Sequence, residues 1–135
     1  MKRREAREQA FILIFERSLN HDTTEQIIDA AEMSSDVMID EFAEKIAVGV
    51  EKNEDVLNTQ IEKNIRGWKM NRLSKVSLSL LKLSIFEMMF EKDIPVSVSI
   101  NEAIDLAKKY GGADDAPFVN GVLGSVAKSL GEKNE

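Results

Sequence analysis

The sequence contains no cysteine and only one histidine among its 135 residues. The absence of cysteine excludes a disulfide framework, a thiolate metal site and a cysteine nucleophile. The single histidine, His21, lies in a polar stretch, and no His, Asp and Glu cluster has the spacing of a metal site. A glycine-rich phosphate-binding loop is also missing. We therefore expect no catalytic residue, no metal site, no cofactor and no enzymatic activity.

Long hydrophobic runs are missing as well. The most apolar stretch, residues 76–90, is shorter than the roughly 20 residues that span a bilayer, and it contains Lys82 and Glu87. Residues 11–15 are too few for the apolar core of a signal peptide. These absences predict a cytoplasmic protein without a membrane contact. The length fits a single domain, residues 1–135, with a first half of about residues 2–66 and a second half of about residues 67–131.

The sequence also lacks the alternating apolar pattern of β-strands. Apolar residues recur instead at helical spacing along almost the whole chain. Residues 2–19 predict a first helix, and Thr23 or Thr24 can cap a short second one. Ser34 or Ser35 is expected to cap a third helix. Its inward face is predicted to hold Met38, Ile39, Phe42, Ile46 and Val50. A break is expected near Asn53. Gly49 inside this helix indicates a close approach of a neighbouring helix.

Residues 76–90 are apolar on nearly every side, which predicts a buried central helix. Two amphipathic helices follow and form a hairpin. Gly111 and Gly112 are expected to end the first of them through a positive φ angle. Trp68, in the segment before the central helix, is expected to cover the edge of the core. The fold class is therefore all-α, with about seven helices packed around a buried central one.

The charges are unevenly distributed. Asp and Glu number 24 against 18 Lys and Arg, which gives a net charge of −6. An acidic body is not typical of a general nucleic-acid coat and suits a basic partner, although solubility alone is an alternative explanation. Four cations nevertheless crowd the start of the first helix: Lys2, Arg3, Arg4 and Arg7. Cations at a helix N-terminus cost about 0.3 kcal/mol or more each, so they favour an anion-binding role over a merely solvated terminus.

Several stretches together resemble the NusB family of bacterial transcription antitermination factors. They are the start MKRREAREQAFILIF, WKMNR at residues 68–72, VSLSLLKLSIFE at residues 76–87, DIPVSVSINEAIDLAKKYGG at residues 93–112 and PFVNGVL at residues 117–123. The resemblance implies two three-helix halves, each an antiparallel bundle, and a connecting helix. It also implies binding to single-stranded boxA RNA of ribosomal RNA transcripts, together with the basic ribosomal protein NusE, within the transcription elongation complex.

The resemblance also implies the residues of the two interfaces. RNA-binding residues would be Lys2, Arg3, Arg4, Arg7, Phe118 and Asn120, with Phe118 stacking on an unpaired base. NusE-binding residues would be Phe15, Leu19, Val76, Ser77 and Leu80, although relatives usually have an acidic residue in place of Ser77. Two alternatives stay open. One is a protein–protein adaptor of the transcription complex without sequence-specific RNA binding, and the other is a homodimer that uses Phe11 and Phe15 and covers the RNA-binding face.

Overall fold

The computed structural model describes residues 1–133, which form seven α-helices, one 3-10 helix and no strand. The elements are α1 (Arg3–Asn20), α2 (Thr24–Ser34), α3 (Glu41–Lys52), α4 (Glu54–Lys63), η1 (Met70–Arg72), α5 (Lys75–Phe90), α6 (Val96–Tyr110) and α7 (Asp115–Lys133). None of the helices in this range is long and apolar enough to cross a membrane. The predicted all-α fold is confirmed.

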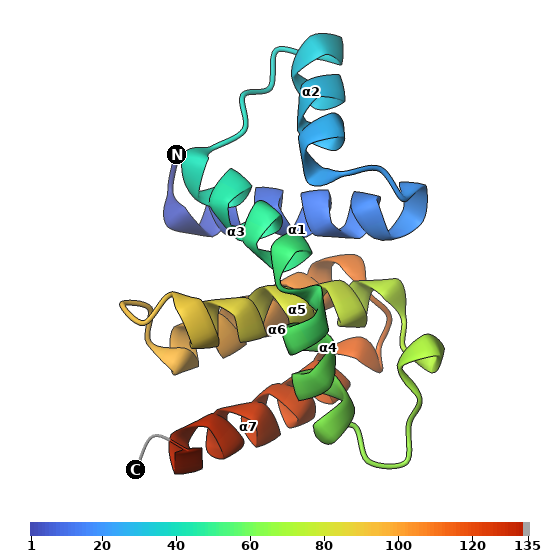
Figure 1. Ribbon diagram of the computed structural model, residues 1–135, viewed down its shortest axis with the longest axis vertical. Coiled ribbons are helices and arrows are strands. Elements are labelled where there is room, and N and C mark those ends of the chain that lie inside the picture. The colour runs from blue at the N-terminus through green and yellow to red at the C-terminus, as the bar shows by residue number, and fades with distance from the viewer. Residues whose placement is uncertain (134–135) are drawn as a thin grey trace.

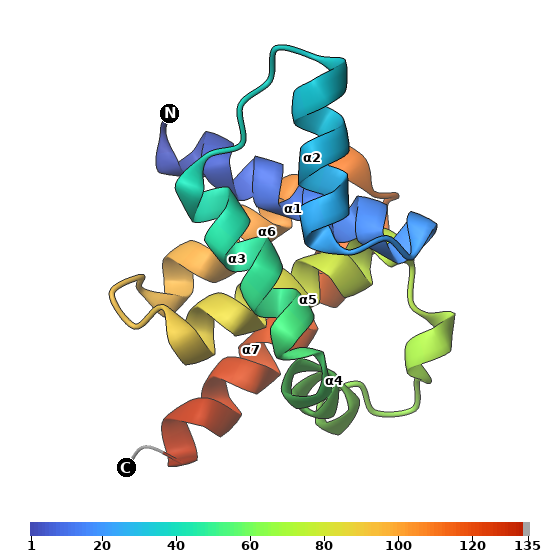
Figure 2. The same ribbon diagram turned by 45° about the horizontal axis from the view of Figure 1, so that its top comes forward.

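Helix α5 lies at the centre of the molecule. It packs against α1, α3, α4, α6 and α7 (Figure 1). Because its sequence is apolar nearly all round, most of its side chains are buried, and Leu80, Leu81 and Ile85 are fully inaccessible. Helix α2 stands away from this body at one end (Figures 1 and 2). The predicted buried central helix is confirmed.

The crossing of α3 over α5 explains Gly49. A Cβ atom at this position would lie 2.3 and 2.5 Å from two ring carbons of Phe86 on α5. Any side chain would therefore push the two helices apart, as the sequence indicated.

The start of the third helix differs from the prediction. Helix α3 begins at Glu41, and the carboxylate of Asp40 caps it by accepting a hydrogen bond from the Phe42 amide at 2.8 Å. Residues 35–40 are not helical, because the side chain of Gln9 donates to the Met38 carbonyl and accepts from the Asp40 amide. Met38 is consequently 79% exposed rather than buried. A contact with α1 decides this boundary, and Ser34 and Ser35 do not cap α3.

Helix α6 ends directly before Gly111, as predicted, but for a different reason. Gly111 has φ −103° and ψ −175°, an extended conformation, so no positive φ is involved. A Cβ atom there would lie 2.6 Å from Oδ2 of Asp115 and 2.8 Å from the Ala107 carbonyl oxygen. Glycine is thus required by close packing between the end of α6 and the start of α7.

Candidate nucleic-acid interface

The cations at the start of α1 fall into two groups. Lys2, Arg3 and Arg4 are exposed, whereas Arg7 faces inward and is only 3% exposed. Helix α1 begins at Arg3 without a side-chain cap from Lys2, so its first amides stay open at the surface. The exposed members can meet an anion directly, and the buried one cannot.

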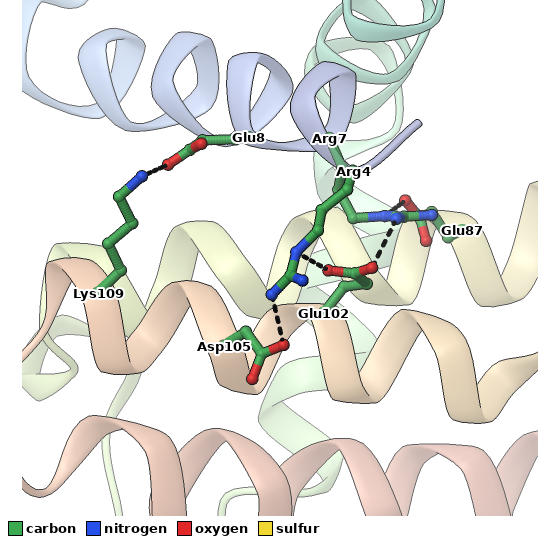
Figure 3. A network of polar contacts seen from close by, with 7 residues as sticks. All are labelled: Arg4, Arg7, Glu8, Glu87, Glu102, Asp105 and Lys109. Carbon is green, nitrogen blue, oxygen red and sulfur yellow. Dashed lines mark hydrogen bonds and ion pairs between the residues drawn. The ribbon is translucent and has the colours of Figure 1, made fainter. Parts of the chain in front are cut away.

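Arg7 is held by a buried ion pair (Figure 3). Its Nε lies 2.7 Å from Oε2 of Glu87 on α5, which is 0% exposed, and its Nη1 lies 3.8 Å from Oε1 of Glu102 on α6. The Ser99 hydroxyl donates to the other oxygen of Glu87 at 2.6 Å. This placement is at odds with the predicted direct contact between Arg7 and RNA. Arg7 instead joins α1 to α5 and α6.

Arg4 and Arg3 are engaged more loosely. Arg4 lies on the surface with Nη2 at 2.8 Å from Asp105 and Nε at 3.3 Å from Glu102 (Figure 3). The guanidinium carbon of Arg3 lies 3.9 Å from the ring centroid of Phe42. Exposed ion pairs are worth only about 0–1 kcal/mol. A phosphate group can therefore replace these contacts at small cost.

One turn further along α1, Glu8 accepts hydrogen bonds from Lys109 at 2.6 Å and from the Tyr110 hydroxyl at 2.5 Å. These two bonds lower the pKa of Glu8, because both favour the charged carboxylate. Two exposed cations along the α1–α6 seam, Arg4 and Lys109, thus have carboxylates beside them. The seam presents mixed charge rather than a continuous basic stripe.

The remaining predicted RNA-binding residues lie on α7, away from the first turn of α1. Phe118 is half-buried, and its ring meets that of Trp68 edge to face at 5.8 Å between centroids. Asn120 is exposed and shares a surface depression with Lys108 of α6. Arg3 and Arg4 are thus neighbours in the first turn of α1, whereas Phe118 and Asn120 line two different depressions beside α7. The C-terminal part of α6 lies between α1 and α7.

The position of Trp68 was predicted wrongly. Its side chain is 59% exposed, so it does not cover the core. It lies in the segment between α4 and α5, residues 64–74, which we call the connector; the connector loops away from the helices in Figure 1. The sequence did contain a signal for this segment. Residues 63–86 hold six Lys and Arg and no Asp or Glu, in a chain of net charge −6.

Comparison with known proteins decides the family. The model of the NusB family matches residues 4–128. The chain belongs to the NusB family. It is 41% identical to the transcription antitermination protein NusB of Clostridium novyi (strain NT), over 96% of this chain and all of that protein. It is 43% identical to the protein of the same name from Clostridium botulinum (strain Loch Maree / Type A3), over 93% of this chain and 99% of that one.

Solved NusB structures share the fold. The structure of T. maritima NusB has 34% sequence identity and a TM-score of 0.82, covering 95% of this chain and 92% of that one. A structure of the antitermination factors NusB and NusE in complex with dsRNA has 25% identity and a TM-score of 0.83, covering 96% of this chain and 99% of that one. The NusB fold inferred from the sequence is confirmed.

The residues that the NusB resemblance assigned to NusE differ in accessibility. Leu19 is exposed, and Phe15 and Val76 are half-buried. Ser77 and Leu80 are only 1% and 0% exposed, so neither can belong to a contact surface in this structure. The Ser77 hydroxyl points toward α7 and donates to Oδ1 of Asp115 at 2.6 Å. This internal bond takes the place of the partner contact expected at Ser77.

The suggested homodimer contact also changes. Phe11 is buried, with its ring 5.8 Å from Phe15 and 5.0 Å from Tyr110. It therefore belongs to the seam between α1 and α6 and is not available to a second copy of the chain.

Proposed function

We propose that this chain is an RNA-binding transcription antitermination factor. It binds single-stranded boxA RNA of ribosomal RNA transcripts together with the ribosomal protein NusE, and it modulates termination by RNA polymerase without catalysing a reaction. The observation that carries this proposal is membership of the NusB family along residues 4–128. The likeness to a NusB solved with NusE and RNA, over 96% of this chain, supports the two partners.

The proposed RNA-binding residues are Lys2, Arg3 and Arg4, with Phe118 and Asn120 on α7. When RNA binds, a phosphate replaces Asp105 and Glu102 as the partner of Arg4. The planar guanidinium of Arg4 donates two charge-assisted hydrogen bonds to this phosphate. Arg7 acts indirectly, because its pair with Glu87 fixes the helix turn that carries the other cations. The acidic body attracts a basic partner, and that partner adds positive charge near the RNA.

The proposed NusE surface consists of Phe15 and Leu19 at the end of α1 and Val76 at the start of α5. Nζ of Lys75 donates to the Ser18 carbonyl at 3.2 Å, which joins these two ends into one surface. The transcription elongation complex is contacted through the NusB–NusE pair. A homodimer would use Phe15 of this surface without Phe11, which is buried.

A triple charge reversal tests the RNA-binding residues. Substituting Lys2, Arg3 and Arg4 with Glu is expected to weaken binding of labelled boxA RNA in fluorescence anisotropy. The slope of log K against log salt should become shallower by about 0.7 for each phosphate that the variant no longer neutralises. The matched control reverses Lys52, Lys92 and Lys128, which are exposed and have no ion pair among residues 1–133. Equal losses of affinity in both variants would show that net charge alone governs binding.

Binding to boxA RNA and to a scrambled RNA distinguishes the proposed function from the adaptor alternative. An RNA-binding factor prefers boxA to a scrambled RNA, with a larger preference when NusE is present. An adaptor binds NusE yet shows no difference between the two RNAs, and that result would overturn the proposed RNA-binding function.

A further inference from the structure

The connector carries positive charge without carboxylate partners, beside the proposed RNA-binding residue Phe118. Arg66, Lys69 and Arg72 are all exposed. Among residues 1–133 no carboxylate lies within 4.0 Å of their charged nitrogens, in contrast to Arg4, Arg7 and Lys109. An anion can approach these three cations without displacing an internal partner. The electrostatic attraction is therefore available in full, apart from screening by salt.

An exposed aromatic corner lies within this basic segment. Trp68 follows Gly67, whose φ of 79° turns the chain and presents the indole outward. The planes of Trp68 and Phe118 meet at 63°, so the two rings form adjacent walls instead of a closed stack. Most of the indole surface stays open to solvent. Such a surface stacks on any nucleobase, since every base has a π face.

The groove beside this corner suits an uncharged group. It has a volume of about 380 Å³, and it is lined by Trp68, Arg72, Leu73, Ser74, Ser77, Asp114, Asp115 and Phe118. The two carboxylates at one side repel a phosphate, and Asp115 is already occupied by hydrogen bonds from Ser74, Ser77 and the Gly112 amide. A base can enter where a phosphate cannot, while its flanking phosphates lie outside against Arg72 and Lys69.

We propose that the connector is a second RNA contact, in which an unpaired base stacks on Trp68 beside Phe118 and its flanking phosphates pair with Lys69 and Arg72. This inference rests on the proposed function, because it takes the same RNA as ligand. Charge complementarity selects RNA over protein here. The protein partner of the proposed function is basic, and three unpaired cations repel a basic surface.

The second contact is linked to the first by a chain of neighbouring residues on α6 and α7. Arg4 touches Asp105 on α6, Lys109 touches Glu8, Lys108 shares a depression with Asn120, and Phe118 on the same helix touches Trp68. A strand of RNA that starts at the first turn of α1 can follow these residues to the connector. The path gives Phe118 and Asn120 a middle position between two groups of cations.

Tryptophan fluorescence tests the stacking directly, because Trp68 is the only tryptophan in the chain. The full chain is titrated with boxA RNA, with and without NusE, while anisotropy of the labelled RNA reports overall binding. We expect the indole emission to be quenched over the same concentration range as the anisotropy change. Replacing one nucleotide at a time by an abasic site should abolish quenching at a single position. A change of emission caused by NusE without RNA would instead make the corner a protein contact and overturn the proposal.

Substitutions supply the second measurement. Trp68→Ala should lower RNA affinity by roughly 5- to 150-fold, whereas Trp68→Phe keeps an aromatic face and loses little affinity. Phe90→Ala, an exposed aromatic at the far end of α5, is the matched control and should have no effect. Lys69→Gln with Arg72→Gln should make the salt slope shallower by about 1.4, or 0.7 for each phosphate. Binding with unchanged emission and no loss of affinity in Trp68→Ala would overturn this inference and leave the proposed function intact. Absence of any RNA binding would overturn both.

Discussion

The molecule has two basic segments, and they differ in what surrounds their charges. At the start of α1, Arg7 is paired with Glu87 inside the protein, and Arg4 is paired with Glu102 and Asp105 at its surface. In the connector, Arg66, Lys69 and Arg72 have no ion pair among residues 1–133. The first segment is denser in sequence, but only Lys2 and Arg3 of its four cations have no ion pair among these residues, whereas all three connector cations have none.

This difference shows that a cluster of cations can serve the fold as well as a ligand. Arg7 fixes α1 against α5 and α6, and that fixed helix then presents Lys2, Arg3 and Arg4 to solvent. The connector has no such internal anchor for its charges. It holds its shape through Gly67, η1 and the contact of Trp68 with Phe118. We therefore expect substitution of Arg7 to affect stability, and substitutions of the connector cations to affect binding alone.

The largest expected effect is that of Arg7→Ala. It leaves the carboxylate of Glu87 buried without its counter-ion, and such a change costs about 3–5 kcal/mol of unfolding free energy. Urea unfolding followed by circular dichroism measures this loss. Arg66→Ala in the connector is the matched control, and an exposed substitution of this kind should change the stability by no more than about 0.5 kcal/mol.

The opposite result for Arg7→Ala would change the role assigned to Arg7. If Arg7→Ala kept full stability and lost RNA binding, Arg7 would be a direct ligand of RNA, as the sequence first suggested. A second variant removes the whole buried pair, with Met at both Arg7 and Glu87. It should recover most of the stability, because well-packed apolar residues often replace a buried ion pair without loss.

The helices and the packing of the centre could be predicted from the sequence. The apolar residues of α5 recur on all sides, and only a buried helix satisfies such a pattern. Gly49 predicted a close crossing because a glycine inside a helix has a cost that packing must offset. Boundaries set by contacts between distant residues were missed. Gln9 keeps residues 38–40 out of α3, and nothing near Ser34 or Ser35 indicates this.

The candidate site was predicted less completely, for a related reason. Local sequence shows that Arg7 is charged, but only the fold shows that it meets Glu87, which is 80 positions away. Ser77 and Leu80 were expected at an interface, yet both face the interior from the central helix. Trp68 was expected to cover the edge of the core, as a tryptophan between helices usually does. The run of cations without acids around it was the better signal, since it predicts a solvated and basic segment.

The next prediction concerns the surface pair of the first segment. Asp105→Asn removes one of the two carboxylates that hold Arg4, so Arg4 is more available to a phosphate. Because an exposed ion pair is worth about 0–1 kcal/mol, RNA affinity should rise by no more than about fivefold. Anisotropy at low salt measures the change. Asp29→Asn removes the same charge from exposed α2 and should leave the affinity nearly unchanged. An equal rise in both variants would assign the effect to net charge and not to Arg4.

The smallest effect concerns the carboxylate that fixes the end of the connector. Burial alone would raise the pKa of Asp115, but hydrogen bonds from Ser74, Ser77 and the Gly112 amide outweigh it and lower the pKa below the usual 3.8. A lowered pKa in the folded state means that the charged carboxylate stabilises the fold above pH 3.8. This contribution is lost as the pH falls through the lower folded value.

Asp115→Asn cannot titrate, so it should lack this part of the acid-induced loss of stability. Unfolding free energies are measured for wild type and variant from about pH 5 to about pH 3. The difference between the two proteins should shrink over this range by about 1 kcal/mol or less, because hydrogen bonds of this kind contribute little more than that. The emission of Trp68 reports the same event locally, since Asp115 holds the start of α7 and hence Phe118 beside the connector. Parallel curves for the two proteins, with equal emission, would show that the connector keeps its place without this carboxylate. The connector would then depend on its aromatic contact alone, and the two basic segments would differ still more in how they are anchored.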